Sequence, residues 1–253
     1  KVRRLITFLP VIRVAVVLIL LSTLIAQDSL PPQAEFYFAR LEYPGYFDNN
    51  NLKNWYTDYP QADNHFVTLA NRLTGVRTTA ARVHIDNDIF QYPFIYIVEP
   101  AQMDLTDAHI LKLREFLARG GFLMLDDIHG DADMVPVQEI LRRILDEDDS
   151  LYELSTQHSL FHTYYDIVEV VQVLHDGIAM CFTCLERYEN GPTGKDPRVL
   201  AHLDWYGNVN VLVMQNNDVA DGLQWLDDSA YPREMAVWSV KWFVNTSVYA
   251  LSH

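Results

Sequence analysis

Apolar and polar residues follow two different periodicities along the chain, and these predict strands and helices in turn. Residues 36–43 (FYFARLEY) alternate with the period of two that is typical of a strand. Residues 94–99 (FIYIVE) and 122–125 are continuous apolar runs, which indicate parallel strands buried on both faces. We expect strands to dominate again between the acidic stretch 146–149 and about residue 214.

Apolar residues at helical spacing separate these predicted strands. The predicted helices cover residues 62–73, the segment that Thr106 opens as N-cap and Gly120 ends, residues 137–145, and the final stretch 233–251. Strands that alternate with amphipathic helices predict an α/β fold with a mostly parallel sheet and helices on both of its faces.

An apolar run precedes the first predicted strand. Residues 5–26 contain a single charge, Arg13, and follow a basic N-terminal flank. A helix of about 20 mostly apolar residues crosses a bilayer core of roughly 30 Å. We therefore expect residues 1–27 to form one transmembrane anchor, whose basic flank places the N-terminus in the cytoplasm.

A cleaved signal peptide is the alternative interpretation of this run. Cleavage after Ala26 would place the bulky Leu24 where the peptidase requires a small residue, so we favour a retained anchor. Residues 28–253 are then expected to form one extracytoplasmic domain. This interpretation predicts a single-pass protein of the bacterial inner membrane with most of its chain in the periplasm.

Charge and cysteine content narrow the possible partners. The chain has 34 acidic and 19 basic residues and a formal net charge of −15, so neither nucleic acid nor an anionic lipid surface is an expected partner. Two cysteines, Cys181 and Cys184, exclude a disulfide framework. The surrounding IAMCFTCL is strand-like, and residues three apart in a strand point to opposite faces. We therefore expect two buried free thiols, and neither a redox pair nor a zinc site.

Candidate chemistry lies where a predicted strand ends. The segment GGFLMLDDIHG brings Asp126, Asp127 and His129 to the carboxyl edge of the sheet, where α/β folds bind ligands. Two carboxylates beside an imidazole suit a divalent metal, or a general acid and base. His158 is a further candidate metal ligand if its segment lies against His129. The structural alternative is that these residues cap helices and tie down loops.

The last predicted helix carries Trp238 and Trp242 at helical spacing, which is most typical of core packing. If this stripe is exposed, both side chains are expected to contact a partner, because Trp is enriched at interface hot spots. Together with Arg13 in the anchor, they are the predicted membrane and partner contacts.

Motifs spread over most of the chain resemble a bacterial family. They are FYFARLEY, Trp55 with Asp58, Pro60, Ala62 and Asp63, then Leu73-Thr74, YPFIYIVEP, LREFLARGGFLMLDDIHG, HSLFHTYY and WFVNTSVYAL. In this order they resemble the family catalogued as domain of unknown function 4159, from about Glu35 to the end of the chain. The resemblance implies a flavodoxin-like sheet of the class I glutamine amidotransferase type and an association with bacterial membrane or envelope proteins.

The resemblance brings a fold without an activity. An amidotransferase of this fold presents a Cys or Ser on a strand-to-helix elbow with a His as base, whereas Asp-Asp-Ile-His follows the buried strand here. We therefore expect no enzyme activity and no cofactor.

Two functions are compatible with the sequence. The first is a non-catalytic accessory subunit whose periplasmic domain docks on and stabilises a larger integral membrane complex. By analogy with other single-span subunits, an energy-transducing complex, photosynthetic or respiratory, is the expected partner. The alternative is a membrane-anchored envelope enzyme or ligand-binding domain that uses Asp126, Asp127 and His129, with a metal ion as a possible requirement.

Overall fold

The computed structural model describes residues 34–45, 54–145, 150–185 and 187–253. The chain divides into two units, Lys1–Ala34 and Glu35–His253. The predicted anchor and its Arg13 lie outside the described residues. Within the described part of the chain, no helix has the combination of length and apolar character that a membrane span requires.

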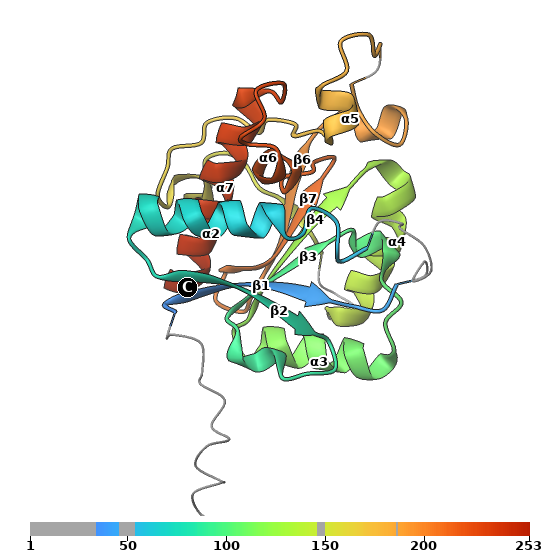
Figure 1. The fold of residues 1–253 in the computed structure, drawn as a ribbon. Helices are drawn as coiled ribbons and strands as arrows, with labels where there is room; N and C mark the ends of the chain where they lie inside the picture. Colours follow the sequence, from blue (N-terminus) through green and yellow to red (C-terminus); the bar gives the residue numbers. More distant parts are fainter. Residues whose placement is uncertain (1–33, 46–53, 146–149, 186) are drawn as a thin grey trace, which may run out of the picture. The chain divides into compact units, whose positions relative to one another are not determined.

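A seven-stranded sheet forms the centre of the second unit (Figure 1). Its strands are β1 (Phe36–Glu42), β2 (Thr78–His84), β3 (Phe94–Val98), β4 (Phe122–Ile128), β5 (Tyr152–Glu153), β6 (Arg198–Leu203) and β7 (Val209–Gln215). Their spatial order is β2-β1-β3-β4-β7-β6-β5. The first five strands in this order are parallel neighbours, and β6 is antiparallel to both β7 and β5. The prediction of a mostly parallel α/β sheet is confirmed, and the parallel strands have the spatial order β2-β1-β3-β4-β7.

Helices cover both faces of this sheet (Figure 1). They are α2 (Gln61–Thr74), α3 (Asp107–Ala118), α4 (Gly130–Ile144), α5 (Asp176–Ala179), α6 (Asp221–Gln224) and α7 (Arg233–Ser252). Short 3-10 helices span Ile89–Gln91, Pro100–Gln102, Ser159–His162 and Pro192–Gly194. The predicted start of α3 is confirmed, because the Thr106 hydroxyl accepts a hydrogen bond from the backbone N–H of His109.

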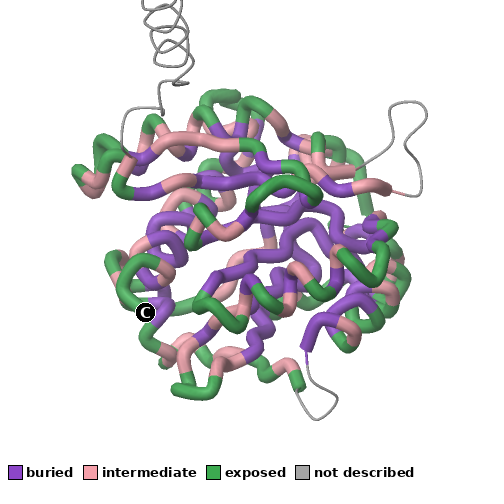
Figure 2. The backbone as a smooth tube through the Cα atoms, turned by 90° about the horizontal axis from the view of Figure 1, so that it is seen from below, coloured by how far each residue is buried: buried purple, intermediate pink, exposed green. Residues whose placement is uncertain are grey.

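Two apolar cores follow from the alternation of side chains along each strand. On β4, Phe122 and Met124 face the core under α2 and α7, whereas Leu123 and Leu125 face the core under α3 and α4. The buried backbone accordingly runs through the middle of the unit, with exposed turns around it (Figure 2). The two-sided burial explains why β3 and β4 are continuous apolar runs in the sequence.

Two segments differ from their predicted secondary structure. Helix α4 begins at Gly130, seven residues before the predicted start, and contains Pro136 within its first turns. Between residues 150 and 197, where we expected strands, the described chain has one two-residue strand and otherwise loops and short helices. Apolar residues of that segment, such as Phe161 in the 3-10 helix Ser159–His162 and Val173 in a loop, pack in the core under α7.

The aromatic stripe of α7 belongs to the core. Trp242 is fully buried and Trp238 is 5% exposed, and the Trp238 indole N–H donates to the backbone carbonyl of Glu169. Their predicted role as partner contacts is therefore wrong in this fold, because neither ring is available at the surface. The core-packing interpretation of their helical spacing is the correct one.

The cysteines also differ from prediction. Cys181 and Cys184 form a disulfide, and the described chain has no free cysteine. The segment that looked strand-like is a turn that follows α5, and Cys184 is exposed. A turn brings residues three apart close together, whereas the extended geometry that we assumed keeps them apart.

Candidate metal centre

The end of β4 positions the residues that the sequence singled out. The pairing of β4 with β7 shifts register between Leu125 and Ile128. Within this irregularity Asp127 has a left-handed backbone, with φ of 60°. The irregularity brings Asp127 and His129, both nearly fully buried, to the carboxyl edge of the sheet. A left-handed non-glycine residue is uncommon, and such conformations concentrate at functional sites.

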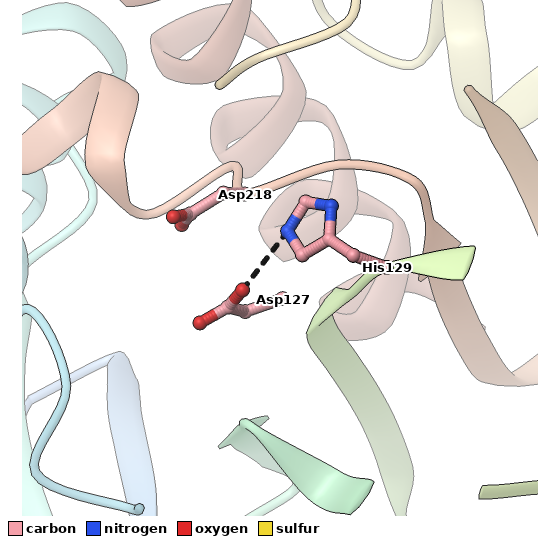
Figure 3. A group of neighbouring side chains, drawn as sticks. All are labelled: Asp127, His129 and Asp218. Atoms are coloured by element: carbon pink, nitrogen blue, oxygen red, sulfur yellow. Dashed lines mark hydrogen bonds and ion pairs between the residues drawn. The ribbon is translucent and has the colours of Figure 1, made fainter. Parts of the chain in front are cut away.

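Figure 3 shows the Asp127 carboxylate and the His129 ring next to each other, with Asp218 beside them. The His129 Nε2 lies 3.0 Å from Asp127 Oδ1 and 3.5 Å from Glu189 Oε1. Asp218 follows β7, the strand next to β4, and is 3% exposed. One ligand atom from each of Asp127, His129 and Asp218 lies within 4.8 Å of the other two, which is a spacing that can hold a metal ion.

Amide side chains fix the loop that carries Asp218. Asn216 has a left-handed backbone with φ of 57°, and its Oδ1 accepts a hydrogen bond of 2.9 Å from the backbone N–H of Gly130. The Oδ1 of Asn217 accepts one of 2.7 Å from the backbone N–H of Val173. The Asn216 contact ties the loop after β7 to the start of α4, and the Asn217 contact ties it to the segment around Val173. The loop that carries Asp218 is therefore linked directly to the end of β4 that carries Asp127 and His129.

A second group of carboxylates lies beside the first. Ligand atoms of Asp58, Asp218 and Asp221 also lie within 4.8 Å of one another, and all three residues are buried. Asp221 begins α6, where its Oδ2 accepts a hydrogen bond of 2.6 Å from the backbone N–H of Asp176. Through Asp221, the acidic cluster therefore extends from the strand ends toward α5.

The segment before α2 supplies Asp58, and a buried arginine holds that segment in place. Arg40 on β1 forms a salt bridge of 2.5 Å with Asp63 of α2. The same guanidinium donates to the backbone carbonyl of Thr57 at 2.9 Å. The Arg40 guanidinium is thus paired with Asp63, and it also holds the backbone next to Asp58 in place.

Asp126 has a different role from that of its neighbour Asp127. Its carboxylate accepts hydrogen bonds from the Tyr96 hydroxyl at 2.9 Å and from the backbone N–H groups of Val219 and Ala220 at 3.2 and 3.0 Å. Burial raises the pKa of Asp126 to about 7, with Asp127 adding to the shift and the hydrogen bonds opposing it. Asp126 therefore holds the loop after β7, as in the structural interpretation of the strand-end acids.

Ionisation of the other buried carboxyl groups in the cluster is electrostatically unfavourable. Burial, together with the nearby Asp221 and Asp127, raises the pKa of Asp58 well above its usual range. Burial and then the charges of Asp127 and Asp221 do the same to the pKa of Asp218. Burial also raises the pKa of Asp221 to about 7. Buried like charges favour protonation, or the binding of a metal that neutralises them.

His158 is not part of this centre. Its ring centroid lies 6.1 Å from that of Tyr249, and the Tyr249 ring lies 6.3 Å from Phe122 at the start of β4. The backbone N–H of Val209, at the start of β7, donates to the Tyr249 hydroxyl. His158 therefore lies at the amino edge of the sheet, opposite Asp127, and its prediction as a metal ligand beside His129 is wrong.

A family model confirms the resemblance seen in the sequence. The model of Domain of unknown function (DUF4159) matches residues 37–251. The chain belongs to the DUF4159 family. No curated protein and no solved structure matches the chain.

Sequence reasoning recovered part of the centre of this DUF4159 domain. Asp127 and His129 were predicted from their place after a buried strand, but Asp218 and Asp221 were missed. The same signal was present in QNNDVAD, which follows the apolar run of β7. Asp58 was quoted as part of a motif without a role, because no local pattern places a loop residue between β1 and α2 against the end of β7.

The donor set limits what this DUF4159 domain can bind. Carboxylates favour hard cations such as Mg²⁺, Ca²⁺ and Mn²⁺, whereas an imidazole favours Zn²⁺ and related metals. A mixture of one imidazole and several carboxylates suits Mn²⁺ or Zn²⁺. Glu99, directly after β3, and Asp127, near the end of β4, both have a left-handed backbone. A nucleophile elbow of a hydrolase would need a thiol or a hydroxyl at such a position, and these side chains are carboxylates.

Proposed function

We propose that this DUF4159 protein is a membrane-anchored envelope protein whose outer domain binds a divalent cation and uses it to bind a small polar ligand. Asp127, His129 and Asp218 are the cation ligands. The observation that carries the proposal is that these three residues are buried together at the carboxyl edge, with ligand atoms within 4.8 Å. This edge is where doubly wound sheets bind their ligands.

The proposal describes a binding domain and not a nucleophilic hydrolase. The parallel strand order supports the glutamine amidotransferase-like part of the fold assignment. The acidic residues at the strand ends support a binding role, because they offer metal ligands in place of a nucleophile. The fold therefore acts as a scaffold, and the chemistry is assigned from the side chains.

The disulfide supports the envelope location. Disulfides form and persist in oxidising compartments such as the bacterial periplasm and are rare in the cytosol. Cys181 and Cys184 are joined, and Cys184 is exposed to solvent. The proposal therefore places the outer domain in the periplasm, and the anchor over residues 1–27 stays a prediction.

Metal analysis and titration test the proposal. The full chain, purified in mild detergent and stripped with a chelator, is titrated with Mn²⁺, Zn²⁺, Mg²⁺ and Ca²⁺ while its thermal midpoint is followed. We expect Mn²⁺ or Zn²⁺ to raise the midpoint, because a cation at 100 times its Kd stabilises the folded state by about 2.7 kcal/mol.

Matched variants locate the site. Asp127→Asn and His129→Gln are expected to weaken binding of that cation at least tenfold, whereas Asp131→Asn, an exposed carboxylate in the first turn of α4, is expected to leave it unchanged. If all three variants bind the cation as the parent does, or if the parent binds none of the four cations, the proposal is wrong.

A non-catalytic accessory subunit of an integral membrane complex is the second candidate function, with a photosynthetic or respiratory complex as the expected partner. One observation favours it: two described surface turns expose large apolar side chains. Phe182 lies between the two bonded cysteines and Leu185 directly follows them, whereas Trp205 and Tyr206 lie in the turn between β6 and β7. Each of the four side chains is more than 85% exposed. Exposed aromatic side chains of this kind are common anchors at protein interfaces.

Purification from native membranes tests this second function. The chain is isolated in mild detergent, and comigrating proteins are identified by mass spectrometry for the parent and for a Trp205→Ser, Tyr206→Ser variant. Stoichiometric partners that the variant loses would support the subunit function. A parent chain that migrates alone would exclude it.

A further inference from the structure

Asp218 belongs to two groups of potential ligand atoms. Its ligand atom lies within 4.8 Å of those of Asp127 and His129, and in the second group it lies within 4.8 Å of those of Asp58 and Asp221. A carboxylate has two oxygens and can bind a separate cation with each of them. Asp218, which the two groups share, is therefore the type of residue that bridges the paired cations of a two-metal site.

An unsatisfied oxygen points to a ligand in the second group. Asp58 is only 7% exposed, and its Oδ2 has no hydrogen-bond donor among the described residues. The side chain that lies within hydrogen-bond reach of the Asp58 carboxyl group is a second carboxyl group, that of Asp221. The backbone of Asp58 is left-handed, with φ of 65°, so the chain adopts an unfavourable conformation to place this carboxylate. Buried polar atoms are almost always paired, and an exception calls for a bound group such as an ion.

The charges of the two groups balance two divalent cations. Together the groups contain four carboxylates, those of Asp58, Asp127, Asp218 and Asp221. One divalent cation would leave a net charge of about −2 among side chains that are each at least nine-tenths buried. Arg40, the buried cation whose charge acts on Asp58, is already bound to Asp63.

We propose that a second divalent cation binds to Asp58, Asp218 and Asp221, and that Asp218 bridges it to the first cation. The inference rests on the proposed function, because it requires a first cation at Asp127 and His129. In two-metal sites the cations lie roughly 3.5–4 Å apart. At such a distance the two groups form one dinuclear centre.

Manganese binding to the full chain tests this inference. The protein in mild detergent is stripped with a chelator, loaded with Mn²⁺ and passed through a desalting column. Bound metal per chain is then measured by mass spectrometry, and the electron paramagnetic resonance spectrum is recorded. We expect two Mn²⁺ per chain and a spectrum of exchange-coupled ions.

Three variants separate the two sites. Asp58→Asn is expected to bind one Mn²⁺ without exchange coupling, Asp218→Asn to bind none tightly, and the surface control Asp131→Asn to bind two as the parent does. Circular dichroism establishes that each variant is folded. Asn at position 58 tolerates the left-handed backbone at least as well as Asp does, which favours folding of the decisive variant.

The outcomes distinguish this inference from the proposed function. If the parent binds one Mn²⁺, which Asp127→Asn loses and Asp58→Asn keeps, the dinuclear centre is wrong while the proposed function stands. If one Mn²⁺ is lost in Asp58→Asn and kept in Asp127→Asn, both assignments are wrong. A parent that binds no Mn²⁺, with Zn²⁺ loading giving the same result, overturns both as well.

Discussion

Two regions of this domain are buried to the same depth and have opposite chemistry. Under α2 and α7, the rings of Phe38, Phe66 and Phe243 pack with centroids 5.0–5.6 Å apart. At the carboxyl edge, Asp127 and Asp218 are equally buried but repel each other. Burial stabilises the first region by the hydrophobic effect, whereas in the second it opposes ionisation of the carboxyl groups, which protonation or the proposed cation would relieve.

Backbone strain follows the same division. The described non-glycine residues with positive φ include Asp58, Glu99, Asp127 and Asn216, all of which follow or precede elements at the carboxyl edge. The aromatic core contains none of them. Strain and buried charge in one place indicate a region kept for binding at the expense of stability, since selection for stability alone would remove both.

The largest expected effect comes from the aromatic core. Phe243→Ala removes a fully buried ring that contacts Phe38, Phe66 and Tyr96. We expect the free energy of unfolding to fall by about 3–5 kcal/mol, as for other large-to-small substitutions of buried aromatic residues. Urea denaturation measures the loss. Mn²⁺ affinity of the folded variant should change less than threefold, and a larger change would show that the two regions are coupled.

The second largest effect should be the change with pH in the free energy of unfolding of the metal-free protein. The pKa of Asp126 is about 7 in the folded state and near 3.8 in the unfolded chain. Between these values the unfolded chain releases a proton that the folded domain keeps, so the free energy of unfolding falls as pH rises from about 4 to about 7. For Asp126 alone the fall is on the order of 4 kcal/mol. Asp221, whose pKa is also about 7, acts in the same direction.

Urea midpoints measured in chelator between pH 4.5 and 7.5 test this dependence. A flatter profile is expected for Asp126→Asn, which cannot titrate at this position. Saturating Mn²⁺ should flatten the profile of the parent, because the cation favours the ionised carboxylates. Stability that increases with pH in the metal-free parent would show that the cluster is not the dominant titrating group.

The contrast between the aromatic core and the carboxyl edge also explains which elements could be predicted from the sequence. The apolar runs of β3 and β4 and the helical stripe of α7 are local patterns that burial imposes, so those elements were predicted to within a few residues. Asp127 and His129 were found because a strand end is visible in the sequence. The approach of Asp58 to Asp218 depends on the spatial order of β1, β3, β4 and β7, and strand order is not encoded in any local pattern.

Errors arose where loops have strand-like composition. IAMCFTCL runs from the end of α5 into a surface turn, and Phe161 lies in a 3-10 helix that packs on the core. A short apolar run does not distinguish these cases from a strand. The start of α4 was also wrong. The helix begins at Gly130 and includes Pro136, whereas the predicted helix began at residue 137.

A smaller effect, with the opposite sign to that in the core, is expected at Asp58. In metal-free protein at pH 8, Asp58→Asn should raise the free energy of unfolding by roughly 1–3 kcal/mol, because a neutral amide replaces a buried carboxyl group that lies against the carboxyl groups of Asp218 and Asp221. The matched control is Asp63→Asn, a buried aspartate that is paired with Arg40 and should lower stability. Destabilisation by both variants would show that Asp58 is satisfied without a cation.

The smallest effect should come from the disulfide turn. Replacement of Cys181 and Cys184 by Ser opens a loop closed over a sequence separation of 3. The entropy of such a short loop limits the loss of stability to about 2 kcal/mol. This turn follows α5, whose first backbone N–H, that of Asp176, donates to Asp221. Mn²⁺ stoichiometry therefore tests the boundary of the metal centre: an unchanged value of two places the turn outside it, whereas loss of one ion would mean that α5 positions Asp221 through the disulfide.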